Sequence, residues 1–258
     1  MLMKVISCLL YALLLFMPTE VHARESISPK GRKDEATLPD NSAPEKTIYL
    51  FSGLGADYRA FRALDLPGYR KVYIQWLKPD HKESMAHYAG RLRSQITTPN
   101  PILIGLSFGG MMAVEVAKQI PAEKIVLISS AKTKTDLAAG SSFFFKWKLY
   151  KVIPGSMLRQ PNFVVNNLFG AETASDKQLL GEILEDTDVS FFRWAMDNIV
   201  HWDNETVPAH LIHIHGTADK IIPYQGVKAD YTIEGGGHLM ILNRADTINK
   251  IILDYLRS

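Results

Sequence analysis

The chain has 258 residues, 47% of them hydrophobic, and a formal net charge of +2 at pH 7. This length and apolar content suit one domain with a full-sized core. The near balance of charge argues against nucleic-acid binding, which usually needs a strongly basic surface.

The first 23 residues have the pattern of an export signal. Lys4 lies in a short leading segment, an apolar run covers 5–17, and VHA at 21–23 resembles a signal-peptidase site. The apolar run is too short to span a bilayer comfortably. We therefore expect an exported protein, periplasmic or secreted, with no stable membrane span once the signal is cleaved. The alternative is an uncleaved signal that anchors the chain.

Cys8 is the only cysteine, and it falls inside this signal. A cleaved chain then has no thiol, which excludes disulfides, a thiolate nucleophile and a cysteine zinc site. The next segment, 24–45, is polar and shows no hydrophobic periodicity. We interpret it as a flexible linker that precedes the domain.

From residue 46 onward, short apolar runs alternate with amphipathic stretches. The predicted strands are 46–53, 71–77, 101–107, 124–130, 210–216 and 230–236. The predicted helices are 82–96, 109–120 and 243–258. This alternation predicts an α/β domain over 46–258, with a mostly parallel sheet flanked by helices on both faces.

Two glycine-rich turns follow strands of this predicted sheet. The first comes after the first strand and contains Leu54. The second is GLSFG, in which Ser107 lies between Gly105 and Gly109 after a strand and before a helix. This context is typical of a nucleophile elbow, where glycines let a sharp turn expose the serine hydroxyl. We expect Ser107 to be a nucleophile and the N–H groups of Leu54 and Phe108 to stabilise an oxyanion.

The alternation of strands and helices is interrupted at about 131–208, after the strand that ends near Ser130. We predict a helical cap here, because the segment has helical patterns and no clear strand. It holds most of the Phe and Trp residues, namely Phe143, Phe144, Phe145, Phe163, Phe169, Phe191, Phe192, Trp147, Trp194 and Trp202. These rings either form the core of the cap and its seam with the sheet, or leave apolar surface facing a pocket.

A serine hydroxyl is a weak nucleophile alone and needs a base, which an acid orients in turn. His238 follows three glycines just past the last predicted strand, on a loop that can bring an imidazole to the sheet edge. Asp219 lies in the turn directly after the preceding strand. We expect Asp219 to accept a hydrogen bond from His238. The alternatives are a surface histidine and an aspartate that only closes its turn.

Other histidines compete with His238 by residue type, namely His201, His210, His213 and His215. His213 and His215 fall on one face of a strand, where we expect packing or hydrogen-bonding roles. A zinc site is the alternative, but no nearby carboxylate spacing supports it. We predict no metal and no cofactor. Asn204 opens an Asn-Glu-Thr sequence that fits a glycosylation acceptor.

Over 46–258 the chain resembles the α/β-hydrolase superfamily. The resemblance rests on GLSFG around Ser107, HGTADKIIP around Asp219 and GGGH ending at His238. It implies Ser107 as nucleophile, Asp219 as acid and His238 as base. It also implies the N–H groups of Leu54 and Phe108 as oxyanion donors.

The chain departs from this superfamily at two points. The turn after the first strand often has His-Gly there, and here it has Ser52-Gly53. The sheet also begins at what would be the third strand of the full fold, so an N-terminal hairpin is absent or reduced. Because the nucleophile is serine, the resemblance does not extend to epoxide hydrolases and haloalkane dehalogenases, which use aspartate.

We therefore expect an exported serine hydrolase that cleaves carboxylic esters through an acyl-enzyme at Ser107. The aromatic cap, without a cluster of phosphate-binding arginines, favours a small apolar ester as substrate. Thioester, amide or carbon–carbon bond hydrolysis is the alternative, because one triad serves all of them. A non-catalytic ligand-binding protein is a third possibility, against which the intact Ser, Asp and His argue.

Overall fold

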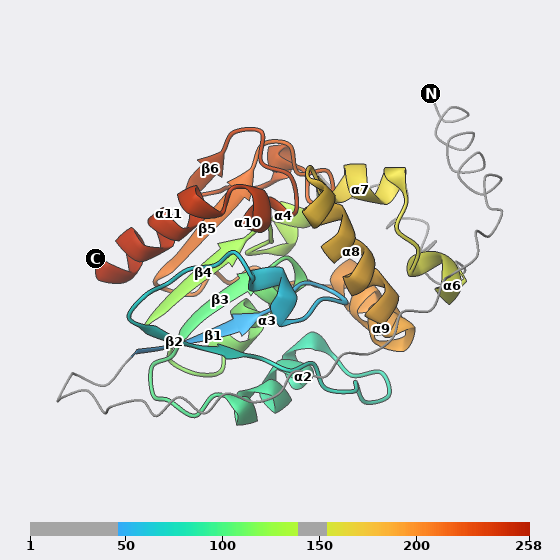
Figure 1. The fold of residues 1–258 in the computed structure, drawn as a ribbon. Helices are drawn as coiled ribbons and strands as arrows, with labels where there is room; N and C mark the ends of the chain where they lie inside the picture. The colour runs from blue at the N-terminus through green and yellow to red at the C-terminus, as the bar shows by residue number, and fades with distance from the viewer. Residues whose placement is uncertain (1–45, 139–153) are drawn as a thin grey trace, which may run out of the picture. The chain divides into compact units, whose positions relative to one another are not determined.

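The computed structural model describes residues 46–138 and 154–258 (Figure 1). The described residues belong to one compact unit, Glu45–Ser258. The predicted signal, the predicted linker and four aromatic residues of the predicted cap lie outside the described residues; the four are Phe143, Phe144, Phe145 and Trp147. In the part that is described, no helix is both long and apolar enough to cross a bilayer.

The described strands form a single parallel sheet in the order β2-β1-β3-β4-β5-β6. Their bounds are β1 Lys46–Phe51, β2 Tyr69–Tyr73, β3 Ile102–Leu106, β4 Lys124–Ile128, β5 Leu211–Gly216 and β6 Tyr231–Ile233. The strand order reverses between β1 and β3. In open parallel sheets, the carboxyl ends of strands at such a reversal form the usual ligand-binding crevice.

Helices cover both faces of the sheet, which confirms the predicted α/β class (Figure 1). Side chains of β1 alternate between the faces, because successive residues of a strand point to opposite sides. Tyr49 and Phe51 pack with α2 (Met85–Leu92) and α3 (Phe108–Ala117). Ile48 and Leu50 pack with α10 (Met240–Asn243) and α11 (Ala245–Arg257). Short 3-10 turns lie at η1 Tyr58–Phe61, η2 Arg93–Gln95 and η4 Tyr224–Gly226.

Several element ends differ from the sequence prediction for local reasons. β2 stops at Tyr73 rather than continuing to residue 77, because β1 ends at Phe51 and offers few further partners. The amide of Leu77 donates instead to the Tyr88 hydroxyl, at 2.8 Å. The last predicted helix is divided at Arg244, which separates α10 from α11.

The described part of 131–208 contains helices and no strand, as the sequence pattern predicts. These helices are α4 Lys134–Ala138, α6 Gly155–Leu158, α7 Phe163–Phe169, α8 Ala174–Asp186 and α9 Val189–Val200. Side-chain oxygens cap three of them at the N-terminus: Asn162 caps α7, Thr173 caps α8 and Asp188 caps α9. Such caps satisfy amides that have no partner inside the helix.

The rings of α9 lie in the seam between the helical segment and the sheet domain. Phe191 is buried, with its ring centroid 6.2 Å from that of Phe108. Trp194 packs on Tyr88 with ring centroids 4.4 Å apart, and its Nε1–H donates to the Glu83 carbonyl at 2.8 Å. For these rings the structure favours packing over pocket lining. Phe163 of α7 differs, since 83% of it is exposed.

Candidate active site

Ser107 occupies the sharp turn between β3 and α3. Its backbone has φ 53° and ψ −123°, a sparsely populated conformation for a residue other than glycine. Three hydrogen bonds hold this turn in place. The Ser107 amide donates to the Ile128 carbonyl at 3.0 Å. The Ser107 carbonyl accepts from the Gly110 amide at 2.9 Å and from the Ser130 hydroxyl at 2.6 Å.

Glycines around the turn make room for backbone rather than for side chains. A Cβ at Gly105 would lie 2.5 Å from the Gly109 carbonyl oxygen, across the turn. A Cβ at Gly109 would overlap the Phe51 carbonyl at the end of β1. Sequence analysis did not single out Gly110, where a Cβ would overlap the Ser130 hydroxyl. The consecutive glycines at 109–110 are the sequence feature that could have indicated this close contact.

The residues predicted as nucleophile, base and acid lie in one chain of hydrogen bonds. His238 Nε2 is 2.9 Å from Ser107 Oγ, and His238 Nδ1 is 2.8 Å from Asp219 Oδ2. An ionised carboxylate only accepts, so the Nδ1 proton of His238 faces Asp219. Nε2 is then free to accept the Ser107 proton. Asp219 and His238 are buried, whereas Ser107 is partly exposed.

Asp219 remains ionised in this arrangement. Burial acts to raise its pKa, but the interactions with His238 and His215 and the hydrogen bond from the Ile222 amide together lower it below its ordinary value. The second carboxylate oxygen, Oδ1, accepts from the amides of Ile221 and Ile222, both at 2.9 Å. Asp219 therefore closes its turn and also faces His238, so the two interpretations offered by the sequence are compatible.

The loop that carries His238 is supported by α7. The Leu239 amide donates to the Phe169 carbonyl at 2.8 Å. The Phe169 ring meets the imidazole of His238 edge-on, with centroids 5.7 Å apart. Gly170 and Gly237 approach so closely that a Cβ at either would lie about 3 Å from the other's backbone. Sequence analysis missed this support, because it depends on where the helical segment lies.

The predicted oxyanion turn lies beside Ser107. A Cβ at Gly53 would be 3.6 Å from the Ser107 Cβ. Leu54, the next residue, is partly exposed. Among acceptors in the described residues, none takes the N–H of Leu54 or of Phe108. Both N–H groups are therefore unpaired among the described residues.

Ser52 stands where the resembled superfamily often has histidine, and it stabilises the same turn. Its hydroxyl donates to the Ala56 carbonyl at 2.6 Å and accepts from Trp76 Nε1 at 3.0 Å. In the same turn, Gly55 has φ +73° and packs against Thr187, which lies just past the end of α8. The hydroxyl of Thr187 is 3.4 Å from the Gly55 carbonyl. The helical segment thus contacts the oxyanion turn as well as the base loop.

The remaining histidines do not join this chain of hydrogen bonds directly. His201 and His210 are exposed. His213 and His215 are fully buried and bonded to each other at 3.2 Å, which fits the predicted hydrogen-bonding role.

One group in the described chain brings metal-type ligands together, namely Asp80, Glu83 and His87. Arg91 already binds Glu83 at 2.7 Å and lies 3.4 Å from Asp80. His87 Nδ1 is 2.6 Å from the other Glu83 oxygen. The cluster is accounted for as an ion-pair network between α2, which carries His87 and Arg91, and the segment before it, which carries Asp80 and Glu83.

Asn204, the residue of the glycosylation pattern, is buried in the folded chain. Its amide nitrogen donates to the carbonyls of Lys132 and Thr206, both at 2.8 Å. Its amide oxygen accepts from Lys118 Nζ at 3.0 Å. The side chain therefore links three segments and presents no free amide for a glycan.

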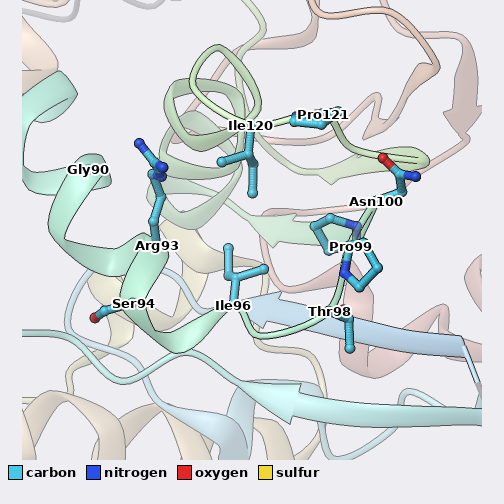
Figure 2. Close-up of a pocket in the computed structure, with 10 residues that line it drawn as sticks. Gly90, Arg93, Ser94, Ile96, Thr98, Pro99, Asn100, Ile120 and Pro121 are labelled. Atoms are coloured by element: carbon cyan, nitrogen blue, oxygen red, sulfur yellow. The ribbon is translucent and has the colours of Figure 1, made fainter.

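A cavity of about 620 Å³ lies beside the start of β3 (Figure 2). It is lined by the end of α2, the segment before β3 and the residues after α3, including Arg93, Ile96, Pro99, Ile120 and Pro121. Because β3 begins beside this cavity and Ser107 follows its other end, the two features lie at opposite edges of the sheet. The cavity therefore does not belong to the candidate site.

Comparison with known proteins identifies the family and the fold. The model of a family described as "Alpha/beta hydrolase family" matches residues 44–251. Among curated proteins, no sequence matches the chain.

Similar solved structures include an esterase from Exiguobacterium antarcticum, with a TM-score of 0.60 and 16% identity, covering 83% of this chain and 92% of that one. An enol-lactonase from Burkholderia xenovorans has a TM-score of 0.58 and 16% identity, with 84% and 93% covered. A meta-cleavage product hydrolase from Pseudomonas fluorescens has a TM-score of 0.60 and 16% identity, with 82% and 90% covered. At such identities the likeness shows a shared fold.

Proposed function

Because this chain belongs to the alpha/beta hydrolase family, we propose that it is a serine hydrolase that cleaves carboxylic esters through an acyl-enzyme at Ser107. The observation that carries the proposal is the hydrogen-bond chain from Ser107 through His238 to Asp219, built on a strained turn at the carboxyl edge of the sheet. Backbone strain of this kind clusters at functional sites.

The reaction follows from the positions of the protons. His238 Nε2 accepts the Ser107 proton while Oγ attacks the ester carbonyl, and Asp219 stabilises the imidazolium that forms. The N–H groups of Leu54 and Phe108 donate to the oxyanion of the tetrahedral intermediate, where one such donor is worth roughly 3 kcal/mol. His238 then gives its proton to the leaving alcohol. Water, activated by His238 in the same way, attacks the acyl group, releases the acid and restores Ser107.

Apolar side chains near the site support an apolar acyl or alcohol group in the substrate. Phe169 lies against His238, and Leu54 is partly exposed beside Ser107. We also propose that 131–208 acts as a cap over this edge, which its contacts with the base loop and oxyanion turn support. We also propose that the signal-like residues 1–23 direct export of the protein. Fractionation of cells that express either the full chain or residues 24–258 tests this.

Activity-based labelling with the full chain tests the proposal. We expect a fluorophosphonate probe to modify Ser107 and short-chain nitrophenyl esters to be hydrolysed. Ser107→Ala should abolish both, whereas Ser94→Ala, which removes an exposed hydroxyl on η2, should change neither. A parallel panel of thioesters, amides and carbon–carbon substrates ranks the alternatives. Labelling that persists in Ser107→Ala, or a folded wild type without ester turnover, would contradict an ester-cleaving enzyme.

A further inference from the structure

Two buried histidines lie directly behind the acid of the candidate triad. His213 and His215 belong to β5, the strand that leads into the turn of Asp219, and both have no exposed surface. Buried polar atoms usually have hydrogen-bond partners, and three of the four ring nitrogens here do, whereas His213 Nδ1 has none among the described residues. The partners of these rings show what the pair does.

The hydrogen bonds of His215 fix the positions of its protons. Its Nε2 is 2.8 Å from the carbonyl oxygen of Ile222, which can only accept, so Nε2 carries a proton. In a neutral ring, Nδ1 is then an acceptor. It lies 3.2 Å from His213 Nε2, which therefore donates to it. The donors run in one direction, from His213 through His215 to the Ile222 carbonyl.

This chain of donors ends on the residue that holds Asp219. The amide of Ile222 donates to Asp219 Oδ1 at 2.9 Å, while its carbonyl accepts from His215. Ile222 is therefore held through both its amide and its carbonyl. His215 Nε2 is also 3.6 Å from Asp219 Oδ2, the atom that accepts from His238. That separation is too long for a hydrogen bond, but it places the N–H dipole of His215 beside the carboxylate.

Burial favours the neutral form of both rings. Desolvation lowers the pKa of His215 against the opposing effects of Asp219 and Asp136, and it lowers that of His213 further, with help from His215 and Lys132. Tyr224 stacks on the other side of the His215 ring, with centroids 6.5 Å apart. A neutral His215 donates to Ile222 without competing as a cation for the carboxylate that His238 needs.

We propose that His215 is a positioning residue of the catalytic acid: through the Ile222 carbonyl, its Nε2–H holds the Asp219 turn so that Oδ2 faces His238. This inference rests on the proposed function, because it gives His215 its role through the triad. It assigns to a buried histidine a part in catalysis without contact with substrate.

The first test measures protons in the wild-type protein and does not depend on turnover. In protein labelled with ¹⁵N-histidine, two-bond ¹H–¹⁵N correlations at pH 7 distinguish the two neutral tautomers from the cation. We expect His215 to be neutral with its proton on Nε2, its signals being identified as those missing from His215→Gln. A proton on Nδ1 alone, or a cation, would overturn the proposal.

The second test separates positioning from general stability. His215→Leu fills the space but removes the donor, and His215→Gln restores an N–H within reach of Ile222. We expect His215→Leu to lower kcat about tenfold or more with KM within about twofold, because small displacements of triad groups reduce turnover strongly. We expect His215→Gln to recover most of that loss. The downfield resonance of the His238 Nδ1 proton, absent in His238→Ala, should weaken or shift in His215→Leu and return in His215→Gln.

The outcomes distinguish this inference from the proposed function. A folded His215→Leu with wild-type kcat and an unchanged His238 resonance would overturn the positioning role while leaving the hydrolase intact. If the wild type is not labelled by the probe and does not hydrolyse esters, the proposed function fails. The tautomer of His215 and the His238 resonance still test whether His215 positions Asp219. If His215→Leu does not fold, His215→Gln decides, since loss of the His238 resonance in that folded variant would also contradict the proposal.

Discussion

The Ser130 hydroxyl donates to the Ser107 carbonyl at 2.6 Å, although 23 residues separate them in the chain. Ser130 lies just past β4, the strand that pairs with β3, and it is fully buried. The bond therefore ties the strained turn to the neighbouring strand. It is one of the contacts that keep Ser107 in a conformation it would not adopt alone.

Replacing Ser130 by alanine should loosen the turn. We expect the free energy of unfolding to fall by about 1 to 2 kcal/mol, because a buried carbonyl loses one of its donors. We also expect kcat for a nitrophenyl ester to fall several-fold. Ser129→Ala is the matched control, since Ser129 Oγ is buried with no partner among the described residues. Urea unfolding should show Ser129→Ala to be neutral or slightly stabilising, and equal losses in both variants would contradict this role of Ser130.

Gly109→Ala should disrupt the site through backbone contact alone. The added Cβ would overlap the Phe51 carbonyl, so β1 and α3 must separate. We expect a loss of at least about 3 kcal/mol in unfolding free energy, or an insoluble protein. Gly90→Ala, also inside a helix, meets only the end of the Gln119 side chain at 3.1 Å. That variant should gain up to about 1 kcal/mol. Chemical denaturation of both variants checks this difference in stability. A Gly109→Ala variant that unfolds like wild type would contradict the prediction.

Some of the site follows from sequence because the features involved are local. A strand, two glycines around Ser107 and a helix lie within one short stretch, and their order alone predicts the turn. Asp219 and His238 are predictable in the same way, since each follows a strand, and parallel strands bring their carboxyl ends to one edge. The partners of these residues are not local. Ser130 bonds to Ser107 only because β4 lies beside β3, and no pattern around Ser130 indicates that contact.

The helical segment shows the same limit. Its helical character follows from the sequence pattern, whereas the bounds of its helices and caps such as Thr173 come from the structure. Its contacts with the oxyanion turn and the base loop depend on packing between distant parts of the chain, which periodicity does not encode. The aromatic residues illustrate the difference, because Phe191 is buried in the seam whereas Phe163 is largely exposed. Composition alone gave both residues the same two interpretations.

Gly55→Ala should reveal how far the helical segment supports the oxyanion turn. Gly55 has φ +73°, and a Cβ there would lie 2.6 Å from the Thr187 hydroxyl. Gly68→Ala is the control, because Gly68 has φ +85° but open space around it. Both variants should lose about 1 kcal/mol to backbone strain. Only Gly55→Ala should also lower kcat, by about tenfold or more, as the donor at Leu54 shifts. Steady-state kinetics beside thermal melts check this, and equal kcat in the two variants would contradict it.

The buried histidine pair should make stability depend on pH. Burial lowers the pKa of both His213 and His215 below the ordinary value of 6.5. As pH falls below that value, the unfolded chain binds protons at these rings and the folded chain does not. The free energy of unfolding must therefore decrease as pH falls from about 7 toward 5, by up to about 1.4 kcal/mol per pH unit for each histidine. The contribution of the two neutral histidines to the free energy of unfolding is fully present above the unfolded-state pKa and declines below it.

His213→Leu isolates this dependence on pH, because it removes the more strongly shifted ring without touching Asp219 or His238. We expect urea unfolding between pH 5 and 7 to show a flatter slope for this variant than for wild type, by up to about one proton. His81→Gln is the control, since it replaces an exposed histidine outside this pair. A slope in His213→Leu as steep as that of wild type would mean that the ring protonates within the folded protein. That result would contradict a neutral pair behind the acid, since a protonated His213 would place a positive charge beside His215.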